Sequence, residues 1–224
     1  MNSVLHFDNI VSLGGSCKVA YEARAYFDFG QAYPFDWWIC KAKSLACYLE
    51  NLDPEGLYAE GNLELIQNNE ISQIASKLYD FRFHHEFGRH WELPNHPVRQ
   101  DWRDGIENVK IRHLSLMSRF LSLNVAGNNI LFVRTCEMPG DADGAIDLLG
   151  AIDKLFNKAD WRMLIINGNG TYEDRHAISR QIQLKNLEWN GLASREWSGL
   201  FLELGLAVTQ SSKRFDRKVR AESD

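Results

Sequence analysis

Two continuous apolar runs constrain the fold of this chain most strongly. Residues 130–133 read Ile-Leu-Phe-Val, and residues 163–166 read Met-Leu-Ile-Ile. Runs of this length without polar alternation are typical of strands that are buried on both faces. A helical pattern precedes each run, over residues 101–123 and 145–156. The sequence therefore predicts a three-layer α/β fold, in which a mostly parallel sheet carries helices on both faces.

Further elements extend this pattern toward both termini. We expect strands at residues 10–13, 79–87 and 186–189, and a final helix over 197–208. The polar, mixed stretch after Asp53 favours loops and short helices. As domains, we predict a single α/β domain over 1–209, in which 53–100 form an insert or subdomain, followed by a flexible tail over 210–224.

Composition narrows the range of functions. The chain has 224 residues and a formal net charge of −5, which gives no basic footprint for nucleic acid. No apolar run reaches membrane-spanning length, and the first residues have neither the basic nor the apolar part of a secretory signal. The four cysteines form neither a C-x-x-C pair nor a dense framework. We therefore expect a cytoplasmic protein with free thiols, no nucleic-acid partner and no membrane association.

The stretch Ser-Leu-Gly-Gly-Ser-Cys at residues 12–17 reads as a strand end, a tight turn and a helix start. Gly14 and Gly15 allow a sharp turn, and Ser16 is a natural N-cap for the first helix. Cys17 then falls in the first helical turn, where the helix dipole and the amides favour a thiolate. Those amides also suit a developing oxyanion.

Cys17 has a second interpretation, because a lone cysteine is commonly a small core residue. A strand-Gly-Gly-helix turn also binds anions in proteins that do no thiol chemistry. The residues alone leave both interpretations open.

An aromatic segment, Tyr-Pro-Phe-Asp-Trp-Trp, occupies residues 33–38. Its composition favours a loop that packs inward, with Asp36 among aromatic rings. A buried acid needs hydrogen-bond partners, since an unpaired charge is costly there. Asp36 either caps the helix that follows or orients a base or substrate in a site near Cys17. We expect this segment to line the Cys17 site.

Four histidines lie between residues 84 and 96. Their spacing matches no metal-ligand pattern, so we predict no metal site and no cofactor. His84 and His85 lie on opposite faces of the predicted strand, and Glu86 follows them. If all strands were parallel, Cys17, His85, Arg134 and Asn167 would share the edge where active sites of such sheets lie.

Several of these segments together resemble a bacterial family described as "putative papain-like cysteine peptidases". The similar parts are Ser-Leu-Gly-x-x-Cys at 12–17, Pro-Phe-Asp-Trp at 34–37, His-Glu-Phe at 85–87, and the Arg-Phe and Leu-Phe-Val-Arg segments ending at 120 and 134. The family usually has His-Asp-Phe where this chain has His-Glu-Phe at 85–87. The resemblance implies Cys17 as nucleophile and His85 as base, and it makes a papain-like α+β fold the alternative architecture.

Three functional hypotheses follow. In the first, the chain is a cysteine hydrolase or acyl transferase acting on a small molecule or peptide. Cys17 attacks, His85 moves the proton and Asp36 or Glu86 orients His85. The substrate-binding residues would be Gly14, Gly15, Ser16, Trp37 and Arg134. In the second, the chain binds or transfers a sugar or nucleotide phosphate in surface-polysaccharide synthesis, with the glycine turn and Arg134 on the phosphate. In the third, it is a non-catalytic interaction domain that uses exposed aromatic residues.

Overall fold

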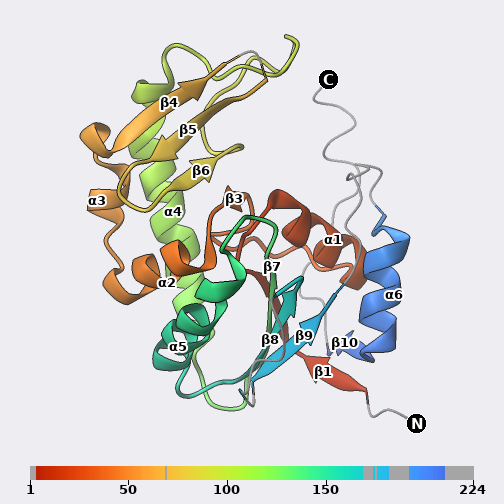
Figure 1. Cartoon of the computed structure of the whole chain (residues 1–224). Helices are drawn as coiled ribbons and strands as arrows, with labels where there is room; N and C mark the ends of the chain where they lie inside the picture. The colour runs from red at the N-terminus through yellow and green to blue at the C-terminus, as the bar shows by residue number, and fades with distance from the viewer. Residues whose placement is uncertain (1–3, 69, 169–173, 175, 182–191, 210–224) are drawn as a thin grey trace.

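The fold is built around a four-stranded parallel sheet (Figure 1). The computed structural model describes residues 4–68, 70–168, 174, 176–181 and 192–209. The strands lie in the order β2 (Asn9–Ser12), β7 (Asn129–Thr135), β8 (Asp160–Ile166) and β9 (Ala177–Arg180). All three pairings between them are parallel. The predicted α/β class and the three strands predicted for this sheet are confirmed.

Helices cover both faces of this sheet, as the continuous apolar runs predicted. On one face, Leu131 and Leu164 share an apolar cluster with residues of α1 (Cys17–Phe27) and α6 (Arg195–Glu203). On the other face, Phe132, Ile165 and their neighbours belong to the main core. That core includes α2 (Ala42–Asn51), α4 (Ile106–Leu121) and α5 (Ala145–Leu155). Successive strand residues therefore supply two cores, which requires the strands to be apolar throughout.

A second, antiparallel sheet stands beside the first (Figure 1). Its strands run in the order β3 (Trp38–Ile39), β6 (Phe81–Phe83), β5 (Ser72–Ser76) and β4 (Leu63–Gln67). The short elements α3 (Pro54–Tyr58) and η1 (Glu60–Asn62) precede β4.

The expectation of loops and short helices after Asp53 was therefore wrong for the two segments that form β4 and β5. β5 reads Ser-Gln-Ile-Ala-Ser, yet all five residues are buried. One of its polar side chains has a partner inside the fold, since the Ser72 hydroxyl accepts a hydrogen bond from the Val98 amide (2.8 Å). The polar residues of this segment are buried, and the sequence pattern does not distinguish a buried polar residue from an exposed one.

The strand predicted over 79–87 is shorter than expected and is not parallel. β6 covers only Phe81–Phe83 and pairs antiparallel with both β3 and β5. Phe81 and Phe83 are both buried, so their expected common face is confirmed. His85 consequently follows a strand of the second sheet, and the argument that placed it on the edge of a parallel sheet was wrong.

The C-terminal part of the described chain also differs from expectation. The helix predicted over 197–208 ends at Glu203, because Gly205 takes a positive φ of 63°. The chain then forms β10 (Leu206–Val208), which pairs in parallel with β1 (Leu5–Phe7). The strand β9 was not predicted. The strand expected at 186–189 and the tail at 210–224 lie outside the described residues.

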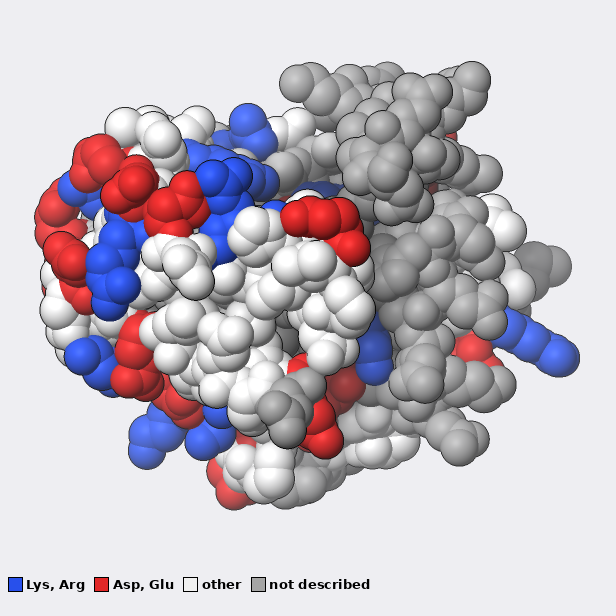
Figure 2. All heavy atoms as spheres, turned by 90° about the horizontal axis from the view of Figure 1, so that it is seen from above, with Lys and Arg blue, Asp and Glu red and all other residues white. Residues whose placement is uncertain are grey.

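The surface carries mixed charge. Seen from above, Figure 2 shows acidic and basic side chains interspersed over the left part of the molecule, beside a largely uncharged area. None of the described helices is long and apolar enough to cross a lipid bilayer.

The core of the parallel sheet gives a first testable prediction. The Ile165 side chain is fully buried in β8, so Ile165→Ala should reduce the free energy of unfolding by about 2–5 kcal/mol. Chemical denaturation measures this change. The matched control is Ile146→Ala on α5, where the side chain is 65% exposed and the loss should be small. Equal losses in the two variants would contradict the assigned burial.

His113 of α4 lies in the aromatic core that joins α4 to the second sheet. Its ring stacks on Trp38 with 5.1 Å between ring centroids, and its Nε2 is 2.6 Å from the Tyr48 hydroxyl oxygen. Burial lowers the pKa of His113 from its usual 6.5 to about 4. The fold therefore holds this imidazole neutral at pH values where the unfolded chain protonates it.

This difference predicts a loss of stability in acid. The contribution of His113 is complete above its unfolded pKa and is lost as the pH falls from about 6.5 toward about 4. The loss is up to about 3 kcal/mol, measured by denaturation at about pH 7.5 and about pH 4.5. His113→Gln should flatten this part of the profile, whereas the same change at the exposed His96 should not. An unchanged profile in His113→Gln would rule out this cause.

Candidate functional site

The turn after β2 is tight, as the two glycines predicted. It leaves no room for side chains at these two positions. Gly14 and Gly15 have φ values of 72° and 89°, in the region that favours glycine. A Cβ on Gly14 would lie 3.1 Å from Cys40 Sγ and 3.2 Å from the Trp38 carbonyl oxygen. A Cβ on Gly15 would lie 2.4 Å from the carbonyl oxygen of Thr135. The turn is therefore packed between the aromatic segment and the end of β7.

Ser16 occupies the N-cap position of α1, but it does not cap the helix through its side chain. Its hydroxyl instead donates to Glu137 Oε1 (2.9 Å), and Lys18 Nζ lies 3.8 Å from the other oxygen of that carboxylate. The expected capping bond was wrong because Glu137 follows β7 at the same edge of the sheet and offers a charged acceptor. The Ser16 side chain therefore does not compete for the first-turn amides of α1.

Cys17 is the first residue of α1, as predicted, and its side chain is partly exposed. All four cysteines are free thiols. Cys40 and Cys136 are buried, and burial raises the pKa of the Cys136 thiol to about 11. Cys47 is exposed on α2. Among the four, Cys17 thus combines access to solvent with a position at a helix N-terminus.

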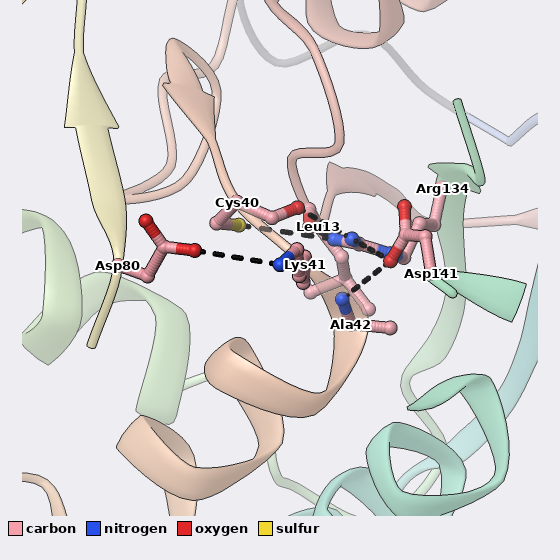
Figure 3. Close-up of polar contacts among 7 residues, drawn as sticks. All are labelled: Leu13, Cys40, Lys41, Ala42, Asp80, Arg134 and Asp141. Carbon is pink, nitrogen blue, oxygen red and sulfur yellow. Dashed lines mark hydrogen bonds and ion pairs between the residues drawn. The ribbon is translucent and has the colours of Figure 1, made fainter. Parts of the chain in front are cut away.

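Arg134 lies inside the protein, not on its rim (Figure 3). Its side chain is 0% exposed, and its guanidinium donates to the carbonyl oxygens of Leu13 (2.7 Å) and Cys40 (2.6 Å). It also forms an ion pair with Asp141 Oδ1 at 2.8 Å. These bonds join the turn before Cys17 to the start of α2. The predicted contact of Arg134 with substrate finds no support in this position, because its Nη atoms are bonded within the protein.

Asp36 is buried in the aromatic segment, with 2% of its surface exposed. It accepts a hydrogen bond from Arg24 of α1 and another from the Tyr33 amide (2.7 Å). Burial raises the pKa of Asp36, and the Arg24 charge opposes that rise. Asp36 does not cap α2, because the Ala42 amide donates to Asp141 instead (2.6 Å). The expectation that Asp36 accepts hydrogen bonds in a buried setting is confirmed.

The aromatic segment also contacts the segment that carries His85. β3 pairs with β6 so that Trp38 lies opposite Phe83. The ring of Trp37 lies 5.0 Å from that of His85, and Trp38 Nε1 donates to Glu86 Oε1 (3.2 Å). Burial raises the pKa of Glu86, and the positive charge of Arg112 opposes this effect. One loop thus packs on the glycine turn and on the His85 segment.

His84 has a different environment from His85. Its Nδ1 faces the Arg89 guanidinium at 3.4 Å, and the backbone oxygen of His84 accepts a hydrogen bond from Arg89 Nε. Burial, followed by the Arg89 charge, lowers the pKa of His84 to about 4. His84 is therefore neutral at physiological pH. This environment makes it a poor source of positive charge for a thiolate.

The expectation that four site residues share one edge of the parallel sheet is confirmed only in part. Of the four residues expected there, Cys17 and Asn167 follow β2 and β8, whose carboxyl ends lie on the same side because the strands are parallel. Arg134 lies within β7, and His85 follows β6 of the second sheet. Glu137, which the sequence did not single out, follows β7 at this edge. Within the described residues, no group of three or more His, Cys, Asp or Glu side chains has the arrangement of a metal site. Sequence reasoning missed Arg24, Arg89 and Asp141, whose roles depend on contacts between distant segments.

Comparison with the models of protein families shows to which family this chain belongs. The model of a family described as "putative papain-like cysteine peptidase" matches residues 8–169. The chain belongs to this family. No curated protein matched the chain, and no solved structure matched it either. The matched region contains the parallel sheet as far as β8 and the whole antiparallel sheet. It also contains every residue named as catalytic from the sequence.

The buried ion pair gives a stability prediction for the site. Arg134→Met leaves Asp141 charged without its partner in the interior, so it should cost about 3–5 kcal/mol of unfolding free energy. The comparable surface change is Lys154→Met, which removes an exposed pair with Glu50 and should cost at most about 1 kcal/mol. Chemical denaturation compares the two. A small effect of Arg134→Met would show that the pair is not needed to join these segments.

Proposed function

We propose that this chain is a cysteine-dependent hydrolase in which Cys17 is the nucleophile and His85 the general base. Family membership supports cysteine peptidase chemistry in general. The observation that carries the assignment is the aromatic segment, which packs on Gly14 beside Cys17 and also contacts His85 through Trp37. The helix N-terminus at Cys17 supplies a dipole and amides that stabilise a thiolate.

The reaction follows from these roles. His85 takes the proton of the Cys17 thiol, and the sulfur attacks a carbonyl carbon of the substrate. The amides around residues 15–18 hold the negative oxygen of the tetrahedral intermediate. His85 then gives its proton to the leaving group, and an acyl group remains on sulfur. Water releases this acyl group in hydrolysis, and a different nucleophile would make the chain an acyl transferase.

The two acids have different roles in this proposal. Glu86 is adjacent to His85 and is held by Trp38, so it is the acid that orients the histidine. Asp36 positions α1 instead, because its hydrogen bond to Arg24 holds the helix that begins with Cys17. We propose a peptide or small acylated molecule as substrate. We also propose that the protein acts in the cytoplasm, because a reducing compartment suits four free thiols.

The phosphate-binding hypothesis loses its main cation in this structure. It required Arg134 to face a ligand, and the guanidinium is fully buried against Leu13, Cys40 and Asp141. We therefore propose the hydrolase alone.

Thiol labelling tests the proposal. Iodoacetamide at about pH 6 should alkylate Cys17 faster than Cys47, because only a stabilised thiolate reacts well below the usual thiol pKa of about 8.5. Cys47 is the informative comparison, since it is exposed and free, whereas Cys40 and Cys136 are buried. Peptide mapping by mass spectrometry identifies the labelled residue.

Two histidine variants assign the base. His85→Ala should slow the labelling of Cys17 at about pH 6 by roughly tenfold or more, in the range of general base contributions. His84→Ala is the matched control, and it should leave the rate nearly unchanged because its pKa of about 4 makes His84 a weak base. Labelling of Cys17 no faster than Cys47 would overturn the hydrolase proposal. Dependence on His84 would overturn the assignment of His85.

A further inference from the structure

An exposed tryptophan stacks on the histidine to which the proposal assigns the role of base. Trp91 is 48% exposed, and its ring lies 5.9 Å from that of His85 with 19° between the planes. Trp37 contacts the same imidazole at 5.0 Å. A large apolar side chain that stays half-exposed beside a candidate catalytic group has surface available for a ligand.

The loop that carries Trp91 is fixed at its base. Arg89 and Val98 form an antiparallel bridge, and the His90 amide donates to the Pro97 carbonyl oxygen (2.9 Å). Arg89 is only 6% exposed, and its guanidinium donates to the backbone oxygens of His84 and His96. This buried guanidinium ties the loop to the segment just before His85. The loop that carries Trp91 is therefore held at its base before a substrate arrives, which lowers the entropic cost of binding.

Two imidazole rings, those of His85 and His96, lie beside the Trp91 indole. The His96 ring lies 5.2 Å from the indole, and Leu93 is exposed in the same loop. The acid of the loop, Glu92, is bonded to His90 (2.9 Å). An apolar ring of a ligand can pack on the exposed part of the indole beside these imidazole rings.

We propose that Trp91 is a specificity-determining residue, which forms an apolar wall beside the reacting carbonyl. It favours substrates whose acyl or amide portion carries an uncharged apolar ring. This inference rests on the proposed function, since it requires Cys17 to react next to His85. The contact is with the substrate ring, so the effect of Trp91 is measured as a ratio of rates between two probes, in which a change in thiol reactivity cancels.

A pair of probes separates these effects. Iodoacetamide and 2-iodo-N-phenylacetamide both alkylate a thiolate, with a new bond from sulfur to the methylene carbon and loss of iodide. The ratio of their rates at Cys17, divided by the ratio for N-acetylcysteine, measures recognition of the ring. In the wild type this normalised ratio should be about 2 to 10, the preference expected for one aromatic contact.

The variants then test Trp91 itself. Trp91→Ala should bring the ratio close to one, whereas Trp91→Phe should keep most of the preference. Leu93→Ala is the matched control, because it removes another exposed apolar side chain from the same loop. Circular dichroism checks that each variant is folded.

The two proposals fail in different ways. Rapid iodoacetamide labelling of Cys17 with a ratio that is unchanged in Trp91→Ala would overturn the role of Trp91 and leave the hydrolase intact. A wild-type ratio of one would do the same. Labelling of Cys17 no faster than Cys47 by iodoacetamide would overturn the proposed function and this inference together.

Discussion

The buried ion pair between Arg134 and Asp141 is the interaction on which the arrangement of the site depends (Figure 3). Arg134 comes from β7, and its guanidinium also binds the backbone of Leu13 and Cys40. The same oxygen of Asp141 accepts the first amide of α2. A charge in the interior is tolerated only when it is paired and hydrogen-bonded. The pair therefore fixes the glycine turn, the aromatic segment and α2 relative to one another.

The aromatic segment extends this network from one sheet to the other. Asp36 binds Arg24 on α1, while Trp38 pairs with β6 and holds Glu86. The segment is therefore attached to the helix that begins with Cys17 and to the strand that precedes His85. Two candidate catalytic residues, which follow strands of different sheets, depend on one loop for their relative position. A loop with this role must be rigid, which accounts for its many buried aromatic rings.

Family membership and fold contribute different kinds of information. The family description points to cysteine peptidase chemistry, and the Cys17 helix matches the local requirement for a reactive thiol. That helix packs on a parallel sheet here, whereas a papain-type fold places its cysteine helix against an antiparallel barrel. A cysteine at a helix N-terminus is compatible with either architecture. The residues of the site therefore indicate the type of reaction, and the surfaces around them indicate the substrate.

The sequence by itself determined the parallel sheet, the glycine turn and the start of the Cys17 helix. These features depend on local properties, namely apolar runs and backbone angles open to glycine. The tertiary structure alone decided that Arg134 is internal, that β6 belongs to a second sheet, and that Trp91 stacks on His85. A charged residue at a strand end has the same local sequence whether it faces solvent or a buried acid. Only the contacts between distant segments distinguish the two, because the energy of a charge depends on what surrounds it.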